Sequence, residues 1–249
     1  DLHSFPTRRS SDLDLASVMY VNNETGVINN IGELTRIMHE HSVPVHCDAV
    51  QAFGKLDIDI NVLGVDYLSI SGHKIHAPKG VGALFVRDRT TISPLIFGTQ
   101  EKGCRGGTQN VLGIIGFGKA ASVAYSGTSF IANNRNMQKL RDELEARLRT
   151  ELDGVSKVII NGETAPRVSN TSNIGFVGID AYKLLHKLEA RGIYVSNGSA
   201  CNLEKSYVLK AMKSPVYENG AIRVSLSADN EPRDIEYFIA NLVKEIKSL

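Results

Sequence analysis

The sequence lacks an excess of charge of one sign, a long run of apolar residues and a set of closely spaced cysteines. Its net charge is only +1, which gives no electrostatic reason to expect a nucleic acid or an anionic membrane as a partner. No apolar stretch approaches the length needed to span a bilayer. The three cysteines, Cys47, Cys104 and Cys201, are an odd number without metal-ligand spacing. We therefore expect reduced thiols in the cytoplasm and no metal site.

The first thirteen residues stand apart from the rest of the chain. They show no helical or strand periodicity, and they lack the apolar stretch of a signal peptide. We interpret residues 1–13 as a foreign or artefactual tail fused to an incomplete reading frame. A natural disordered tail is the alternative.

Strand-like and helix-like segments alternate in the first half of the chain. Ile31, Leu34, Ile37 and Met38 recur at helical spacing, so we predict a helix over residues 31–41. Short apolar runs, several of them bounded by Gly or Pro, predict strands at residues 17–21, 43–47, 67–70 and 82–86. This alternation predicts an α/β architecture with a mostly parallel sheet, whose ligands bind beyond the carboxyl ends of the strands.

The pattern changes after Thr108. Residues 113–124 read as a helix of small residues, and a long charged helix follows. Its apolar stripe consists of Met137, Leu140, Leu144, Leu148 and Leu152. Strands are predicted at residues 157–160, 173–177 and 223–226. Asp180 is the expected N-cap of a helix that Gly192 ends, and Pro232 opens a last amphipathic helix. We therefore predict a partial large domain over residues 14–124, and a linking helix with a small C-terminal domain over residues 125–249.

Two segments carry residues suited to pyridoxal phosphate chemistry. Asp48 ends an apolar strand, and Lys74 lies in a loop after the strand that ends in Ser69-Ile70-Ser71-Gly72-His73. A lysine amine can condense with the aldehyde of that cofactor, and a carboxylate can pair with its pyridinium nitrogen. The alternatives are a solvated surface lysine and an aspartate that caps a turn.

A thiol and a guanidinium in the second half add two candidates. Cys201 follows Gly198-Ser199-Ala200, a small and mobile sequence that suits a nucleophile which must reach a cofactor and then a partner. Arg223 opens a strand, and its planar guanidinium fits a substrate carboxylate bidentately. A buried structural cysteine and a surface arginine are the alternatives, and Cys47 and Cys104 are interpreted as structural.

From about Ser17 to the C-terminus, the order and spacing of these motifs resemble the cysteine desulfurases, pyridoxal-phosphate enzymes that take sulfur from free cysteine. The resemblance implies the aspartate-aminotransferase-type fold (fold type I), with an incomplete large α/β domain and a small α+β C-terminal domain. It also implies a homodimer when the protein is full length.

The resemblance assigns further cofactor-binding roles. Gln51 matches the residue that bonds the phenolic oxygen of the cofactor, and Asn23 matches an asparagine ligand. Ser71 and His73 match phosphate-binding positions. Thr108 matches a threonine that reaches the phosphate of the other subunit, although an ordinary loop threonine is nearly as good a reading of the sequence alone.

The implied reaction converts L-cysteine to L-alanine and leaves a persulfide on Cys201. The sulfur would pass to an acceptor protein, a scaffold for iron–sulfur clusters or a relay for tRNA thiolation. Two alternatives within the fold are a selenocysteine lyase and an aminotransferase for small amino acids, and a third is a non-catalytic fragment. Because the family's glycine- and threonine-containing phosphate loop would precede the first matching residue, we expect this chain by itself to be inactive or nearly so.

Overall fold

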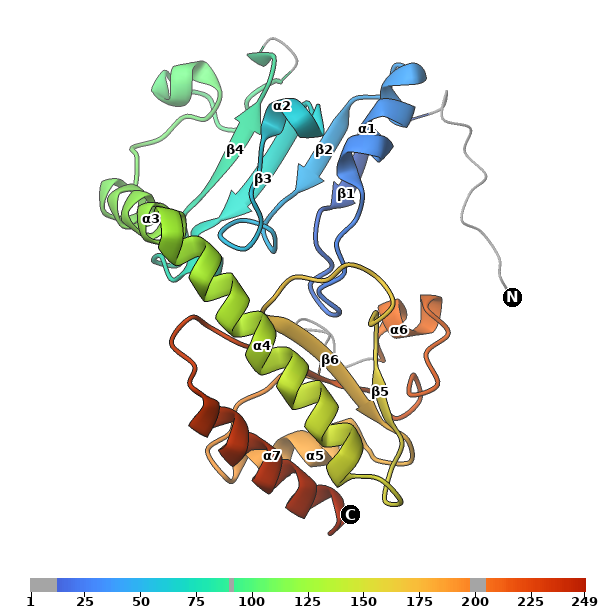
Figure 1. Cartoon of the computed structure of the whole chain (residues 1–249). Coiled ribbons are helices and arrows are strands. Elements are labelled where there is room, and N and C mark those ends of the chain that lie inside the picture. Colours follow the sequence, from blue (N-terminus) through green and yellow to red (C-terminus); the bar gives the residue numbers. More distant parts are fainter. Residues whose placement is uncertain (1–12, 90–91, 198–204) are drawn as a thin grey trace. The chain divides into compact units, whose positions relative to one another are not determined.

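The computed structural model describes residues 13–89, 92–197 and 205–249, and it divides into two compact units (Figure 1). Unit 1 comprises Asp1–Val21 and Asn29–Ser126, and unit 2 comprises Asn22–Ile28 and Gly127–Leu249. The short segment Asn22–Ile28 thus belongs with the second half of the chain. All but the last residue of the interpreted tail, residues 1–13, lies outside the described part.

Unit 1 is built on a four-stranded sheet. Its strands are β1 (Ala16–Met19), β2 (Val45–Asp48), β3 (Tyr67–Ser71) and β4 (Gly82–Val86), which lie side by side in that order (Figure 1). The first three are parallel and β4 is antiparallel to β3, so the predicted mostly parallel sheet is confirmed. Each predicted strand is found within two residues of its expected ends.

One helix of unit 1 packs on this sheet, and other helical segments contact that helix or the turn after β3. Helix α1 (Ile31–Glu40) contacts β2 and the short α2 (Ile60–Leu63), and the side chain of Asn30 caps its first turn by accepting from the backbone N–H of Glu33. Helix α3 (Val111–Ala124) contacts η2 (Gly72–Ile75), the 3-10 turn that carries Lys74. A further 3-10 turn, η4, spans Gln100–Gly103.

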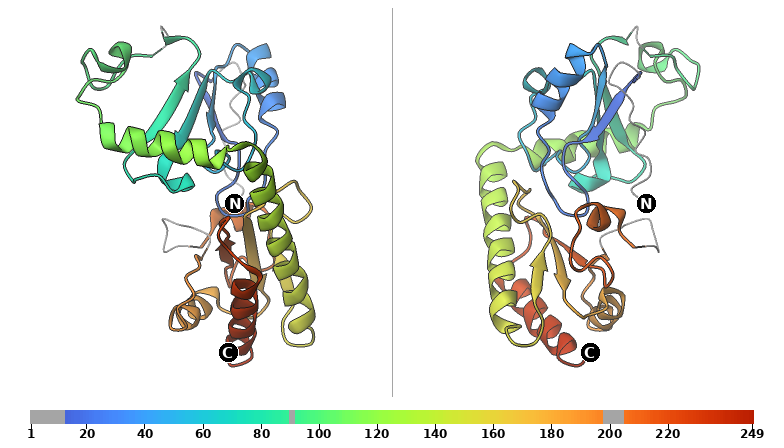
Figure 2. Two further views of the ribbon diagram at one scale, coloured as in Figure 1. Left: turned by 60° about the vertical axis from the view of Figure 1, so that its left-hand side comes forward. Right: turned by 90° about the vertical axis from the view of Figure 1, so that its right-hand side faces the viewer.

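Unit 2 is an antiparallel sheet packed against helices. The strands β5 (Val158–Ile160), β6 (Thr171–Phe176) and β7 (Ile222–Ser225) pair in that order. Its helices are α4 (Gly127–Glu151), α5 (Ala181–Glu189), α6 (Tyr207–Ala211) and α7 (Pro232–Ile246). Helices α4 and α7 run alongside each other (Figure 2), and α5 also contacts α7.

The predicted leucine stripe of α4 forms the centre of the unit 2 core. Its residues from Leu140 onward pack with strand residues such as Ile174 and helix residues such as Leu184 and Ile239 in one buried cluster. Two predicted helix starts are also confirmed. The carboxylate of Asp180 accepts from two backbone N–H groups of the first turn of α5, and Pro232 is the first residue of α7.

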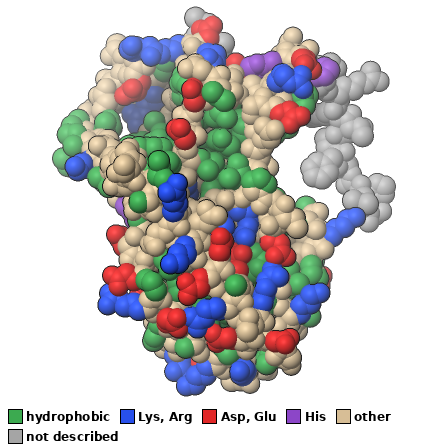
Figure 3. All heavy atoms as spheres, viewed as in Figure 1, with side chains coloured by type: hydrophobic (Ala, Val, Ile, Leu, Met, Phe, Trp, Pro, Cys, Tyr) green, Lys and Arg blue, Asp and Glu red, His purple; other side chains and the backbone are tan. Residues whose placement is uncertain are grey.

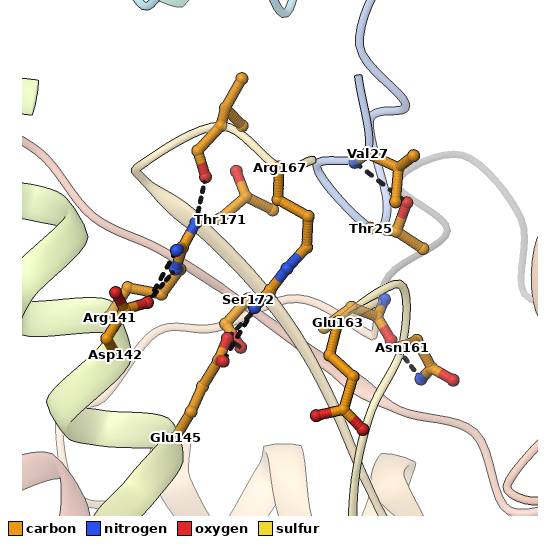
Figure 4. Close-up of polar contacts among 12 residues, drawn as sticks. Thr25, Val27, Arg141, Asp142, Glu145, Asn161, Glu163, Arg167, Thr171 and Ser172 are labelled. Carbon is orange, nitrogen blue, oxygen red and sulfur yellow. Dashed lines mark hydrogen bonds and ion pairs between the residues drawn. The ribbon is translucent and has the colours of Figure 1, made fainter. Parts of the chain in front are cut away.

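A buried polar cluster ties α4 to β6 and to the segment before it (Figure 4). The two Glu145 oxygens accept from the two terminal nitrogens of Arg167 at 2.7 and 2.8 Å, and Ser172 Oγ donates to Glu145 Oε1 at 2.7 Å. Burial alone would raise the pKa of Glu145, but the Arg167 and Ser172 hydrogen bonds outweigh it and lower the pKa. The carboxylate therefore stays charged inside the unit.

The surfaces of the two units differ in character. In the view of Figure 3, charged side chains of both signs cover unit 2, whereas hydrophobic side chains gather on unit 1. The exposed apolar residues of unit 1 include Leu84, Leu95, Ile96, Phe97, Val111, Leu112, Ile114 and Ile115. Apolar exposure of this extent is unusual for a free surface and is typical of an interface. Within the described residues, no helix combines the length and the apolar character needed to cross a membrane.

Candidate active site

Five of the predicted site residues lie at one edge of the unit 1 sheet. Asp48 is the last residue of β2, and its register partner on the parallel strand β3 is Ser69. Ser71 ends β3, and η2 follows at once with His73 and Lys74. Because carboxyl ends of parallel neighbours meet at the same sheet edge, Asp48 and the residues 71–74 share that edge. Gln51 follows Asp48 in the turn that leaves it.

Asp48 shapes the turn that follows β2. It is half-buried, and its Oδ1 accepts from the backbone N–H of Val50 at 3.0 Å. The turn-capping alternative is therefore present in the structure. It does not exclude a second role, because a carboxylate offers two oxygens with several acceptor positions. In the same turn, the side-chain and backbone oxygens of Gln51 both accept from the Lys55 ammonium, at 3.3 and 3.1 Å.

The turn that carries Lys74 is tightly supported while the lysine itself is exposed. Gly72 is buried, and a Cβ at this position would lie 3.1 Å from the side chains of Ala77 and Val81. Ser71 Oγ and His73 Nδ1 are 2.8 Å apart, so the hydroxyl and the imidazole form one hydrogen-bonding group beside the lysine. Lys74 is thus an exposed amine on a closely packed 3-10 turn.

His46 is a member of this region that the sequence did not single out. Its ring nitrogens lie 2.8 Å from Ser17 Oγ and 3.0 Å from Ser69 Oγ, which joins β1, β2 and β3 through side chains. His46 precedes Asp48 by two positions, so both side chains leave β2 on the same face. The alternation of apolar and polar residues along β2 is the signal that could have identified it.

The two remaining cysteines, Cys47 and Cys104, differ in their burial. Cys47 is fully buried, and burial, followed by the charge of Asp48, raises the pKa of its thiol to about 12. A thiol with this pKa is almost entirely protonated at neutral pH and is a poor nucleophile. Cys104 is partly buried. Thr108 lies exposed in the loop that leads to α3.

Unit 2 brings Asn23 and Arg223 together although they lie far apart in the sequence. Arg223 Nη1 donates to the backbone carbonyl of Asn23 at 2.9 Å. Burial lowers the pKa of the Arg223 guanidinium, and the negative charge of Glu24 opposes that shift. Ser196 pairs with Arg223 through two backbone hydrogen bonds, of 2.6 and 3.2 Å. Cys201, five residues further on, lies outside the described residues.

A family model described as aminotransferase class-V matches residues 1–238 of this sequence. The chain belongs to the class-V aminotransferase family. Among curated relatives, the cysteine desulfurase of Klebsiella pneumoniae is 41% identical over 247 residues, which are 97% of this chain and 61% of the relative. The cysteine desulfurase of Gluconacetobacter diazotrophicus is 41% identical over 241 residues, covering 95% of this chain and 59% of the relative.

Solved structures agree with this membership. A NifS-like protein from Rickettsia africae superposes with a TM-score of 0.84 at 35% identity, covering 97% of this chain and 63% of its own. This likeness confirms the predicted α/β fold class of the class-V aminotransferases. The chain spans about three fifths of the length of the relatives it matches.

Class-V aminotransferases depend on pyridoxal phosphate, and the unit 1 sheet edge has a donor set that suits this cofactor. It offers a carboxylate for a ring nitrogen, a primary amine for an aldehyde, and a hydroxyl and an imidazole that can donate to a phosphate. Three of these four groups, those of Ser71, His73 and Lys74, lie in or directly before the closely packed turn that begins at Gly72.

Proposed function

We propose that the chain is the pyridoxal-phosphate-binding and cysteine-bearing part of a cysteine desulfurase, which converts L-cysteine to L-alanine and holds the sulfur as a persulfide. The observation that carries the proposal is the shared sheet edge of Asp48 and Lys74. The similarity to cysteine desulfurases and the presence of Cys201 select this activity within the family. Without a thiol at that position, an aminotransferase would be the better proposal.

In this proposal, unit 1 supplies most of the groups that hold the cofactor. Lys74 would bind the aldehyde carbon, Asp48 would pair with the ring nitrogen and Gln51 would bond the phenolic oxygen. Ser71 and His73 would donate to the phosphate, and Thr108 would reach the phosphate bound by the other subunit of a homodimer. When bound, the cofactor withdraws electrons from the substrate Cα, and Asp48 strengthens this effect by keeping the ring nitrogen protonated.

Three residues outside unit 1 would have the remaining roles. Asn23 would be a further cofactor ligand, and Arg223 would take the substrate carboxylate. The Cys201 thiolate forms a bond to the substrate sulfur while the Cβ–S bond breaks, and the remaining carbon fragment takes a proton to become L-alanine. The outer sulfur of the persulfide would then pass to an acceptor protein for iron–sulfur cluster assembly or tRNA thiolation, which leaves Cys201 as a thiol again.

The test uses the chain in two forms: alone, and joined to the part of a curated relative that it does not cover. The joined protein should absorb visible light with the cofactor bound and release L-alanine from L-cysteine. The chain alone should retain cofactor weakly and be nearly inactive. Equal activity of the two forms would contradict the proposed inactivity of the chain alone, and no activity in either would contradict the proposed function.

Two variants of the joined protein assign the chemistry. Lys74→Ala should abolish the visible absorption, whereas Lys79→Ala, a change of another exposed lysine a few residues further on, should keep it. Cys201→Ser should retain the cofactor but accumulate neither persulfide nor alanine, because a serine hydroxyl attacks a thiol sulfur poorly. Cys104→Ser is the matched control. Sulfide release at the unsubstituted rate in Cys201→Ser would favour a lyase that needs no persulfide.

A further inference from the structure

Glu24 is a buried carboxylate in unit 2 to which the proposed reaction gives no role. Only 3% of its surface is exposed, although its neighbours in the sequence read as an ordinary polar turn. A carboxylate at such a position is costly unless other groups compensate it. Ser206 provides one such group, since its Oγ donates to Glu24 Oε2 at 2.5 Å. The same Ser206 oxygen accepts from the backbone N–H of Leu209 and so caps α6.

The backbone on both sides of Glu24 is also fixed. The side-chain oxygen of Asn22 accepts from the backbone N–H groups of Glu24 and Thr25 at 3.0 and 2.9 Å. The Glu24 carbonyl accepts from Asn173 Nδ2 at 3.2 Å, and Asn173 is fully buried. Asn173 is the register partner of Arg223 in the pairing of β6 with β7. The turn is therefore tied to the strand pair that carries Arg223.

Arg223 is the group that this arrangement orients. Its Nη1 donates to the carbonyl of Asn23, the residue directly before Glu24. The Asn23 carbonyl and the Glu24 N–H belong to one peptide unit, so the contacts that anchor Glu24, at its side chain and at its backbone, together fix the position of that carbonyl. The Glu24 charge also offsets part of the cost of burying the guanidinium.

We propose that Glu24 is a positioning residue: anchored by Ser206, it holds the Asn23 carbonyl against Arg223 and so directs the guanidinium toward the carboxylate of the substrate. This inference rests on the proposed function, in which Arg223 takes that carboxylate. Glu24 itself does not touch the substrate.

The test follows the side-chain Nε–Hε NMR signal of Arg223 in the chain labelled with 15N-arginine. The signal is identified by its absence from the Arg223→Lys variant. Titration with L-alanine should shift it, and L-alaninamide, which lacks the carboxylate, should not. Glu24→Ala should weaken the L-alanine affinity about tenfold, the effect of losing one orienting hydrogen bond. Glu24→Gln keeps an acceptor for Ser206 and should restore the affinity to within about threefold.

Two further variants separate positioning from general destabilisation. Ser206→Ala removes the anchor but leaves the Glu24 charge in place, and it should weaken L-alanine binding as Glu24→Ala does. If Glu24→Ala does not fold, the Ser206→Ala variant by itself tests the positioning role of Glu24. Glu145→Ala makes the same change at another buried carboxylate that accepts from a serine, and it should lower stability without changing the affinity.

The binding measurements distinguish failure of the positioning role of Glu24 from failure of the proposed role of Arg223. An unchanged affinity in Ser206→Ala and Glu24→Ala, or an equal loss in Glu145→Ala, would overturn the positioning role while leaving the proposed function intact. The absence of any carboxylate-dependent shift in the unsubstituted chain would contradict the proposed role of Arg223, and the inference would fall with it.

Discussion

Replacing Glu145 with glutamine should lower the free energy of unfolding of unit 2 by about 3 kcal/mol, the lower end of the cost of breaking a buried ion pair from one side. The side chains of Arg167 and Glu145 are only 7% and 12% exposed, so water cannot replace the lost charge. Glutamine retains one oxygen for Ser172 or Arg167 but presents an N–H₂ group to the second guanidinium nitrogen. The buried Arg167 charge is then left without a counter-charge.

Hydrogen exchange read by mass spectrometry on peptides of α4 and β6 measures this loss locally. A change of about 3 kcal/mol corresponds to roughly a hundredfold faster exchange of the amides that open with the unit. Peptides of β2 and β3 in unit 1 serve as an internal reference. Glu143→Gln is the matched control, because Glu143 faces Arg147 at 3.9 Å on an exposed helix face. Its cost should stay below about 1 kcal/mol.

The pH dependence gives the same prediction a second check. The folded-state pKa of Glu145 lies below its ordinary value of 4.5, so its contribution to stability is fully present above that value. The contribution is lost as the pH falls through the lowered pKa of the folded state. The difference between the unsubstituted chain and Glu145→Gln should therefore shrink below pH 4.5. A pH-independent difference, or a loss under about 1 kcal/mol at pH 7, would show that the Glu145–Arg167 ion pair does not stabilise unit 2 as proposed.

Cofactor binding, thiol reactivity and self-association can each be tested with a single measurement. In the joined protein, Asp48→Ala should weaken cofactor binding at least tenfold in an absorbance titration, since the ring nitrogen loses its counter-charge; unchanged affinity would remove Asp48 from the site. Cys47 should resist iodoacetamide at pH 8 while Cys104 reacts, because a pKa of about 12 leaves almost no thiolate; equal rates in peptide-resolved mass spectrometry would contradict its burial. Leu112→Gln, at an 83% exposed position of α3, should reduce self-association of the isolated chain in analytical ultracentrifugation, and an unchanged distribution would show that this residue takes no part in it.

Regular patterns in the sequence were sufficient to predict most of the helices and strands. The leucine stripe of α4 and the Asp180 cap of α5 act between residues one or a few turns apart, so their signals are local. The short helices α2 and α6 were missed, because four or five residues do not establish a helical period. The structure gives both of them clear caps, formed by Asp59 and Ser206.

The candidate site likewise contains some features that local sequence signals predict and others that depend on tertiary packing. The strand-end position of Asp48 and the loop position of Lys74 could be predicted, since each follows a short apolar run bounded by turn residues. The hydrogen bonds of His46 to two neighbouring strands could not, because they depend on the register of β1, β2 and β3. The role proposed for Cys201 remains a prediction from its motif.

Local patterns in the sequence are enough to predict most elements and the candidate chemistry of each. Three features depend on long-range packing: Asn22–Ile28 joins the second unit, Glu24 is buried there, and Arg223 donates a hydrogen bond to Asn23 across 200 residues of sequence. The difference lies in the range of the forces concerned. Periodicity and capping act within a few residues, whereas the burial of a polar turn is favourable only after distant strands have supplied partners for its backbone and side chains.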